Sequence, residues 1–251
     1  MATTLRLYAL KGVVTGAAEG IGEAVARTFA KHGAQVLAVD SPQSRVNTTF
    51  SKVRGISTAE FGDDPAAVSA MLAETAREHL HGLDILVNNF PEFTDSAPAD
   101  GASDGEQSLR LWLDCIIAAS KAALPLLKKS PAGRIINIGA VRSSFGREGE
   151  AQFAAAEKAL SDLTASQAAE YGAFGITANY IQPGAIMTPV SRAVFDADKS
   201  FRDWCIARSA ARRLGEPVDV AKVALFLASG DSVFVSGTGI ATDGGMLPGA
   251  D

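Results

Sequence analysis

Cysteine and histidine are scarce in this chain of 251 residues, which has two cysteines and three histidines. Cys115 and Cys205 both fall in segments with a helical pattern, which favours reduced core thiols over a disulfide or a metal-binding pair. His32, His79 and His81 stand near expected helix ends, without a neighbouring set of ligand-type residues. The sequence therefore predicts no metal site.

The chain also lacks a long apolar run and an excess of positive charge. No stretch approaches the roughly 18 consecutive apolar residues that a membrane-spanning helix needs, and residues 1–6 lack the apolar centre of a signal peptide. The formal net charge of −5 is opposite in sign to what nucleic acid or an anionic membrane attracts. We expect a cytoplasmic protein that binds a small-molecule ligand, and neither nucleic acid nor membrane.

Strand-like and helix-like segments alternate along the whole chain. Apolar runs typical of buried strands occur near residues 12–15, 35–39, 53–57, 83–88, 134–139, 176–181 and 238–242. Helical patterns separate most of them, at roughly 20–32, 65–81, 104–129, 149–172 and 217–229. Such alternation predicts a single α/β domain over residues 1–251, with a doubly wound parallel sheet of about seven strands and helices on both faces. The segments 90–105 and 189–213 are expected to be long loops at the ligand-binding edge of the sheet.

Residues 13–22 read as the end of a strand, a glycine-rich turn and the start of a helix. Gly16, Gly20 and Gly22 have the spacing G-x-x-x-G-x-G. Glycines at this place let the backbone approach a pyrophosphate, and the helix N-terminus offers free N–H groups to it. A tight strand-to-helix turn without a ligand would use the same residues. The acidic residue that ends the next strand is therefore needed as further support for a nucleotide site.

That strand, predicted at residues 35–39, ends in Asp40. A carboxylate at this position can bind the hydroxyls of an adenosine ribose and repels a 2′-phosphate. The residues therefore favour NAD over NADP as the cofactor.

Motifs along nearly the whole chain resemble, in order, those of the short-chain dehydrogenase/reductase superfamily. They are Thr15-Gly16-(x)3-Gly20-Ile21-Gly22, Asn88-Asn89, Ile136-Asn137-Ile138, Glu170-Tyr171-Gly172, Gly175-Ile176, Asn179, Pro183-Gly184, Thr188, Arg213-Leu214-Gly215-Glu216-Pro217 and Asp243-Gly244-Gly245. The resemblance implies a Rossmann-type domain that binds a nicotinamide cofactor and forms a homodimer or homotetramer. It implies cofactor contacts from Gly16, Gly20, Ile21, Gly22, Asp40, Asn88, Pro183, Gly184 and Thr188, and a substrate crevice formed by loops 90–105, 140–152 and 189–213.

The residues at the family's catalytic positions are different. The family uses a Tyr-x-x-x-Lys pair, a Ser and an Asn. The Tyr passes a proton, and the Lys lowers the pKa of the Tyr and holds the ribose. The Ser polarises the carbonyl, and the Asn helps to hold a water that relays the proton. Counting back from Pro183-Gly184 puts Glu157 at the Lys position, Phe153 at the Tyr position and Ala140 at the Ser position. Counting back from Pro125 puts Trp112 at the Asn position.

A second alignment keeps Lys158 as the lysine, but it places Ala154 at the Tyr position and needs an insertion downstream. Neither alignment leaves a tyrosine donor. Phe90 and Pro91 also add bulk where the family has small residues beside the cofactor.

The sequence is compatible with three functions. The first is a catalytically impaired, NAD(H)-binding protein that acts as a partner subunit or ligand sensor. The second is an NAD-dependent oxidoreductase that acts on an alcohol or carbonyl. In the second case Ser143, a water or the substrate supplies the proton. The third possibility is a lyase or isomerase that uses Glu157 or Glu150 as its base.

Overall fold

The computed structural model describes residues 5–62, 64–90, 103–139 and 151–246, with the backbone alone at 103–108 and 151–153. The strands in this part are β1 (Lys11–Val14), β2 (Gln35–Asp40), β3 (Ile56–Glu60), β4 (Ile85–Asn88), β5 (Arg134–Ile138), β6 (Thr177–Pro183) and β7 (Gly239–Thr242). The helices are α1 (Gly20–Lys31), α2 (Val46–Phe50), α3 (Pro65–Leu80), α4 (Ser103–Leu127), α5 (Ala151–Tyr171), α6 (Pro189–Ala197), α7 (Lys199–Arg208) and α8 (Pro217–Ala228), with short 3₁₀ turns η2 (Gly172–Phe174) and η3 (Gly230–Ser232).

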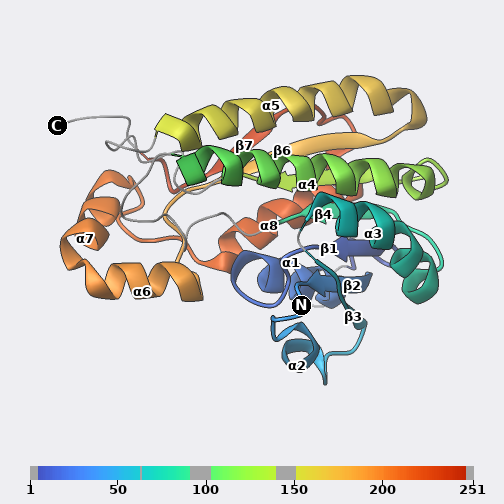
Figure 1. Cartoon of the computed structure of the whole chain (residues 1–251), viewed down its shortest axis with the longest axis horizontal. Helices are drawn as coiled ribbons and strands as arrows, with labels where there is room; N and C mark the ends of the chain where they lie inside the picture. The colour runs from blue at the N-terminus through green and yellow to red at the C-terminus, as the bar shows by residue number, and fades with distance from the viewer. Residues whose placement is uncertain (1–4, 63, 91–102, 140–150, 247–251) are drawn as a thin grey trace.

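The strands form one parallel sheet in the order β3-β2-β1-β4-β5-β6-β7. Helices α3, α4 and α5 pack on one face, and α1 and α8 pack together on the other (Figure 1). The order reverses between β1 and β4, and open α/β sheets bind their ligands at such a point, outside the carboxyl ends of the strands. The expected doubly wound fold is confirmed.

The two hydrophobic cores follow from the alternation of side chains along the strands. In β1, Val14 faces the core beneath α1 and α8, whereas its neighbour Val13 faces the core beneath α3 and α4. Strand β5 is buried throughout because it lies in the middle of the sheet with helices on both sides. A buried central sheet gives the loops at its carboxyl edge a rigid support.

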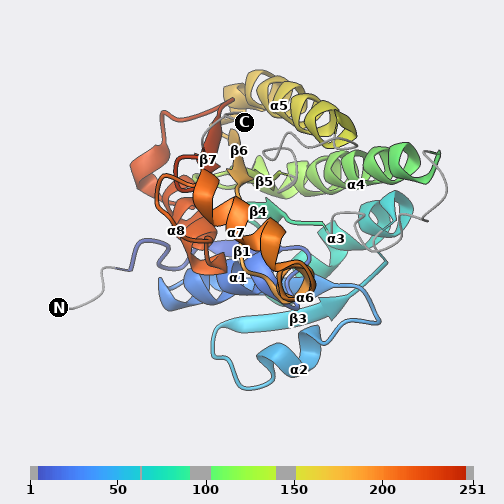
Figure 2. The ribbon, with the colours of Figure 1, turned by 90° about the vertical axis from the view of Figure 1, so that its left-hand side faces the viewer.

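The segment 189–213, expected as a loop, is mostly helical. Thr188 caps α6, accepting a hydrogen bond from the backbone N–H of Ser191 at 3.1 Å, and Asp198 caps α7 through Phe201 N–H at 2.9 Å. These two short helices lie beyond the carboxyl end of the sheet, which faces the viewer in Figure 2. Their N-caps were readable in the sequence, but their short apolar patterns were not distinctive.

The third strand also differs from its predicted position, because it covers 56–60 instead of 53–57. The backbone oxygen of Val53 accepts a hydrogen bond from the N–H of Ile56 in a turn before the strand begins, and Gly55 in this turn has a φ of +84°.

Among the helices that the structure describes, none is both long enough and apolar enough to cross a membrane.

Candidate nucleotide site and adjoining carboxylate

The glycine turn between β1 and α1 is tightly folded against the end of β4. Gly16 and Gly20 have φ values of +56° and +59°, in the left-handed region that favours glycine. A Cβ on Gly16 would lie 1.9 Å from the backbone oxygen of Asn89, and one on Gly22 would lie 2.0 Å from the oxygen of Gly16. Each glycine is therefore required by the geometry of the turn.

Asn89 fastens this turn in place. Its side-chain nitrogen donates to the oxygen of Gly16 at 2.9 Å, and its backbone N–H donates to the hydroxyl of Thr15 at 2.9 Å. Its neighbour Asn88 points elsewhere: it is fully buried and donates to Asn137 at 2.8 Å and to Ser120 at 3.2 Å. The described structure thus places Asn89 at the turn and Asn88 in the interior beneath α4 and α5.

The start of α1 is open to an anion. Its N-cap, Glu19, makes no side-chain hydrogen bond to the first turn within the described chain, so the first N–H groups of a twelve-residue helix stay available. Ile21 is buried beneath the turn and anchors the helix to the core. Glycines at positions 16 and 22 thus keep the turn compact against Asn89, and the N–H groups at the start of α1 are the groups that would hold a pyrophosphate.

Asp40 ends β2 beside the same turn. One carboxylate oxygen accepts the N–H of Ala18 at 2.7 Å and the other accepts the N–H of Ser41 at 2.8 Å. These bonds hold the carboxylate in a fixed orientation, while each oxygen keeps a lone pair for a further donor. Asp40 can therefore receive a ribose hydroxyl without moving.

Two later elements close the turn from the other side. Thr188 approaches Gly20, whose Cβ would lie 3.4 Å from the Thr188 methyl group. Gly184, after Pro183 at the end of β6, packs so closely on Asp243 that a Cβ would lie 2.6 Å from its Cα. Thr188 thus lies next to the glycine turn, whereas Pro183 and Gly184 shape the end of β6.

Glu157 and Lys158, the two candidates for the lysine position, face different ways. The Glu157 side chain is buried, with the residue 7% exposed, and its carboxylate lies over the end of β5: a Cβ on Gly139 would be 2.6 and 2.7 Å from its two oxygens. The Lys158 side chain is 71% exposed and forms an ion pair with Asp162 on the surface of α5. The inward-facing residue is the acid.

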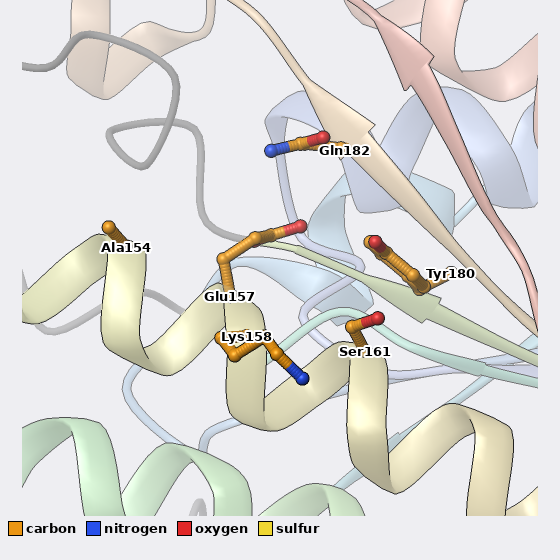
Figure 3. Close-up of a pocket in the computed structure, with 6 residues that line it drawn as sticks. All are labelled: Ala154, Glu157, Lys158, Ser161, Tyr180 and Gln182. Atoms are coloured by element: carbon orange, nitrogen blue, oxygen red, sulfur yellow. The ribbon is translucent and has the colours of Figure 1, made fainter.

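A cavity of about 270 Å³ adjoins this carboxylate, between α5 and β6. Its lining residues are Ala154, Glu157, Lys158, Ser161, Tyr180 and Gln182. In Figure 3 the polar ends of Glu157, Gln182 and Tyr180 point into the same space. The Tyr180 ring lies on Gly239 of β7, where a Cβ would come within 2.1 Å of the ring.

Comparisons with known proteins agree with this architecture. The family model described as "Enoyl-(Acyl carrier protein) reductase" matches residues 16–247. The chain is 32% identical, over 93% of its length and 96% of the relative, to the 3-oxoacyl-[acyl-carrier-protein] reductase FabG of Vibrio cholerae. It is 33% identical to the oxidoreductase UcpA of Escherichia coli K12, over 96% of this chain and 95% of that protein.

Among solved structures, a gluconate 5-dehydrogenase from Burkholderia cenocepacia J2315 in complex with NADP and tartrate superposes with a TM-score of 0.87, at 31% identity, over 98% of both chains. The chain belongs to the short-chain dehydrogenase/reductase superfamily. These relatives include reductases and dehydrogenases, so the family is one of oxidoreductases that use a nicotinamide cofactor.

Ala140, Ser143 and Glu150 lie outside the described residues, as do Pro91 and most of the loops 90–105 and 140–152. Phe153 lies in the first turn of α5, one helical turn before Glu157, and only its backbone is described.

Trp112, which the count from Pro125 predicts at the family's asparagine position, lies in the core beneath α4 and is 1% exposed. Phe90 belongs to the same cluster and is 9% exposed. Its bulk is thus taken up by the core beneath α4.

Sequence reasoning named Asn89 in a family motif but gave the cofactor role to Asn88 alone, and it missed Ser161 and Gln182. Period-two alternation along β4 would have directed Asn88 inward and left Asn89 for the turn. Ser161 lies one helical turn after Glu157, and Gln182 lies on the same strand face as Tyr180. The helical and strand periods could therefore have predicted that these residues share a site.

Proposed function

We propose that this short-chain dehydrogenase/reductase binds NAD(H) but lacks the family's proton-transfer set and acts as a catalytically impaired partner subunit or ligand sensor. The observation that carries the proposal is the inward placement of Glu157 on Gly139 and the outward placement of Lys158. An acid at the lysine position, with Phe153 and Ala140 at the tyrosine and serine positions, leaves no group of that set to move a proton.

The nucleotide-binding residues support the first half of the proposal. The glycine turn and the start of α1 would hold the pyrophosphate, and Asp40 would accept hydrogen bonds from the adenosine ribose. Pro183, Gly184 and Thr188, together with Asn88 in the interior, would shape the nicotinamide side of the crevice. When bound, the nicotinamide supplies the capacity to accept or donate a hydride.

Asp40 also supports a preference for NAD over NADP. Its carboxylate is held by two backbone N–H groups, and a 2′-phosphate beside it would place two negative charges in contact. The Burkholderia relative is described with NADP, so the preference separates this chain from that neighbour. Calorimetric titration should show binding of NADH and at least about tenfold weaker binding of NADPH.

The impairment is tested with a panel of alcohols and carbonyl compounds, by following the absorbance of reduced nicotinamide. We expect nucleotide binding without turnover from the natural sequence. The triple variant Ala140→Ser, Phe153→Tyr, Glu157→Lys should gain activity on at least one compound. Turnover by the natural protein at ordinary enzyme rates of about 1 per second or more would contradict the proposal.

A second candidate is an NAD-dependent oxidoreductase with a substitute proton donor. Hydroxyls of Tyr180 and Ser161 line the same cavity as Glu157, and positioning alone beside a nicotinamide accelerates hydride transfer. If the panel reveals activity, Tyr180→Phe and Glu157→Gln distinguish the donor: a loss of kcat in one variant with KM unchanged identifies the group.

We further infer that the whole chain is a single domain, with its crevice at loops 90–105, 140–152 and 189–213, and that it forms a homodimer or homotetramer. In support of an interface near β7, Phe234 is fully exposed and Val233 is 63% exposed, and large apolar side chains on a surface often mark subunit contacts. Light scattering after gel filtration measures the number of subunits.

A further inference from the structure

Arg134 is a buried cation at the amino end of β5, on the edge of the sheet opposite the nucleotide site. The residue is 5% exposed, and β5 runs from it over about 13 Å to the ligand-binding edge at Ile138. Its side chain projects to the face covered by α1 and α8, because side chains alternate along a strand and Ile136 and Ile138 belong to that core. Arg134 thus lies apart from the residues proposed to bind the nucleotide.

The guanidinium of Arg134 has few partners. Its Nη1 donates to the backbone oxygen of Gly133 at 2.9 Å, whereas its buried Nε has no hydrogen-bond partner. Among the described residues, no carboxylate forms an ion pair with Arg134. Burial lowers the pKa of Arg134, and no acidic group of the described chain offsets that shift. Because arginine stays protonated in proteins, a positive charge is buried here without a described counter-charge.

Two neighbouring groups that could offset this charge are already engaged elsewhere. The backbone oxygen of Asp84, just before β4, accepts the backbone N–H of Arg134 at 2.8 Å, but the Asp84 carboxylate accepts the hydroxyl of Ser130, just after α4, at 2.5 Å. The last turn of α8 ends at the same edge of the sheet, and its Leu227 carbonyl accepts the hydroxyl of Ser232 at 2.9 Å. Neither group bonds to the guanidinium.

Thr177 presents a second unpartnered group beside Arg134. The two residues are register partners on the adjacent parallel strands β6 and β5, about 4.8 Å apart, so their side chains project to the same face of the sheet. Thr177 is 7% exposed, and its buried hydroxyl has no hydrogen-bond partner. The Nε–H group of Arg134 can only donate, and the hydroxyl can donate as well. A single acceptor atom between them would therefore satisfy both groups.

Charge and hydrogen bonding together define the acceptor. A water could accept both hydrogen bonds but would leave the buried positive charge uncompensated, whereas an oxyanion supplies acceptor oxygens and a negative charge at once. We propose that Arg134 and Thr177 bind a small oxyanion, a phosphate or a carboxylate, at the amino edge of the sheet. The site is independent of the proposed nucleotide site, and it makes the stability of the fold depend on the concentration of that anion.

Thermal unfolding in phosphate, with chloride at matched ionic strength as the reference, tests the proposal. At about ten times its dissociation constant, bound phosphate should raise the Tm of the natural protein by roughly 3–5 °C more than that of Arg134→Met, which removes the charge. Exclusion of phosphate from the protein surface and phosphate binding at the glycine turn affect both proteins alike, so they cancel in this difference. Arg54→Met, the same change at an exposed arginine, should respond like the natural protein. Acetate in place of phosphate distinguishes a carboxylate ligand from a phosphate.

Equal shifts in the natural protein and Arg134→Met, with phosphate and with acetate, overturn the proposal and leave water as the partner of the guanidinium. If Arg134→Met does not fold, Thr177→Val decides, because it keeps the shape of the side chain and removes the hydroxyl. A fivefold loss of phosphate affinity in this variant should reduce the rise in Tm by roughly 1.5–3 °C. An unchanged rise in Thr177→Val would contradict the proposal.

Discussion

Replacing Gly139 by alanine measures directly where the Glu157 side chain lies. The added Cβ would approach both carboxylate oxygens within 2.7 Å and their carbon within 3.0 Å, closer than atoms pack in proteins. The φ of Gly139 is outside the left-handed region, so alanine has no backbone strain there and would by itself stabilise the protein by about 0.4–1 kcal/mol.

The steric conflict opposes that gain. Overpacking a buried site costs roughly 1–3 kcal/mol. The carboxylate is the movable end of its side chain and can shift toward the adjoining cavity, so the cost should fall near the lower limit. In a Glu157→Ala background the conflict is absent, and Gly139→Ala should become neutral or stabilising. We expect a coupling energy of about 1–2 kcal/mol between the two substitutions.

Urea unfolding of the four proteins in this cycle measures the coupling as a difference in the free energy of unfolding. A matched cycle with Lys158→Ala should be additive within about 0.5 kcal/mol, because that side chain lies on the surface. If the Glu157 cycle were additive and the Lys158 cycle coupled, lysine would be the inward residue. The assignment of an acid to the lysine position would then be wrong.

Three further substitutions test other parts of the site. Gly16→Ala, at a φ of +56° and 1.9 Å from the oxygen of Asn89, should lower the free energy of unfolding by about 2 kcal/mol or more and weaken NADH binding in calorimetry. Asn137→Ala removes a buried amide that holds Asn88 and two residues of α5; it should cost about 2 kcal/mol or more in urea unfolding, because the partners stay buried without their bonds. The hydrogen bond from Arg213, then that from the N–H of Glu216, lowers the pKa of Asp219 at the start of α8. The ionised Asp219 therefore contributes fully to the free energy of unfolding above the pKa of about 4 that an aspartate has in the unfolded chain. That contribution is lost as the pH falls through the lower pKa of Asp219 in the folded protein. The difference in Tm between the natural protein and Asp219→Asn should accordingly be constant from about pH 7 to about pH 5 and shrink below about pH 4.

Much of the fold was readable from the sequence because its signals are local. Gly16, Gly20 and Gly22 between an apolar run and an amphipathic segment predict the strand, turn and helix in order, and the regular alternation of such units fixes a parallel sheet. The α6 and α7 helices were missed because each is short and amphipathic over only two or three turns. Their stability comes from N-caps and from packing against each other.

The site was predictable only in part. Counting residues placed Glu157 at the family's lysine position, which stays a prediction, and the structure shows that its side chain is buried. The count could not show that its carboxylate lies on Gly139 or that Tyr180 and Gln182 share its cavity, because these contacts join β5, α5 and β6 across large distances in the chain. Asn88 and Asn89 are the same residue type, and only the side to which each one projects separates their roles.

The pair of helices α6 and α7 has a small core of its own, apart from the two that cover the sheet. Phe195 and Cys205 form its centre, with Phe201 and Trp204 stacked beside them at centroid distances of 5.7 Å from Phe195 to Phe201 and 6.0 Å from Phe201 to Trp204. A region held by separate contacts opens at a lower free energy than the body of the protein. Amide hydrogens of this pair should therefore exchange well before those of the central strands, and ligands could enter or leave without loss of structure in the sheet.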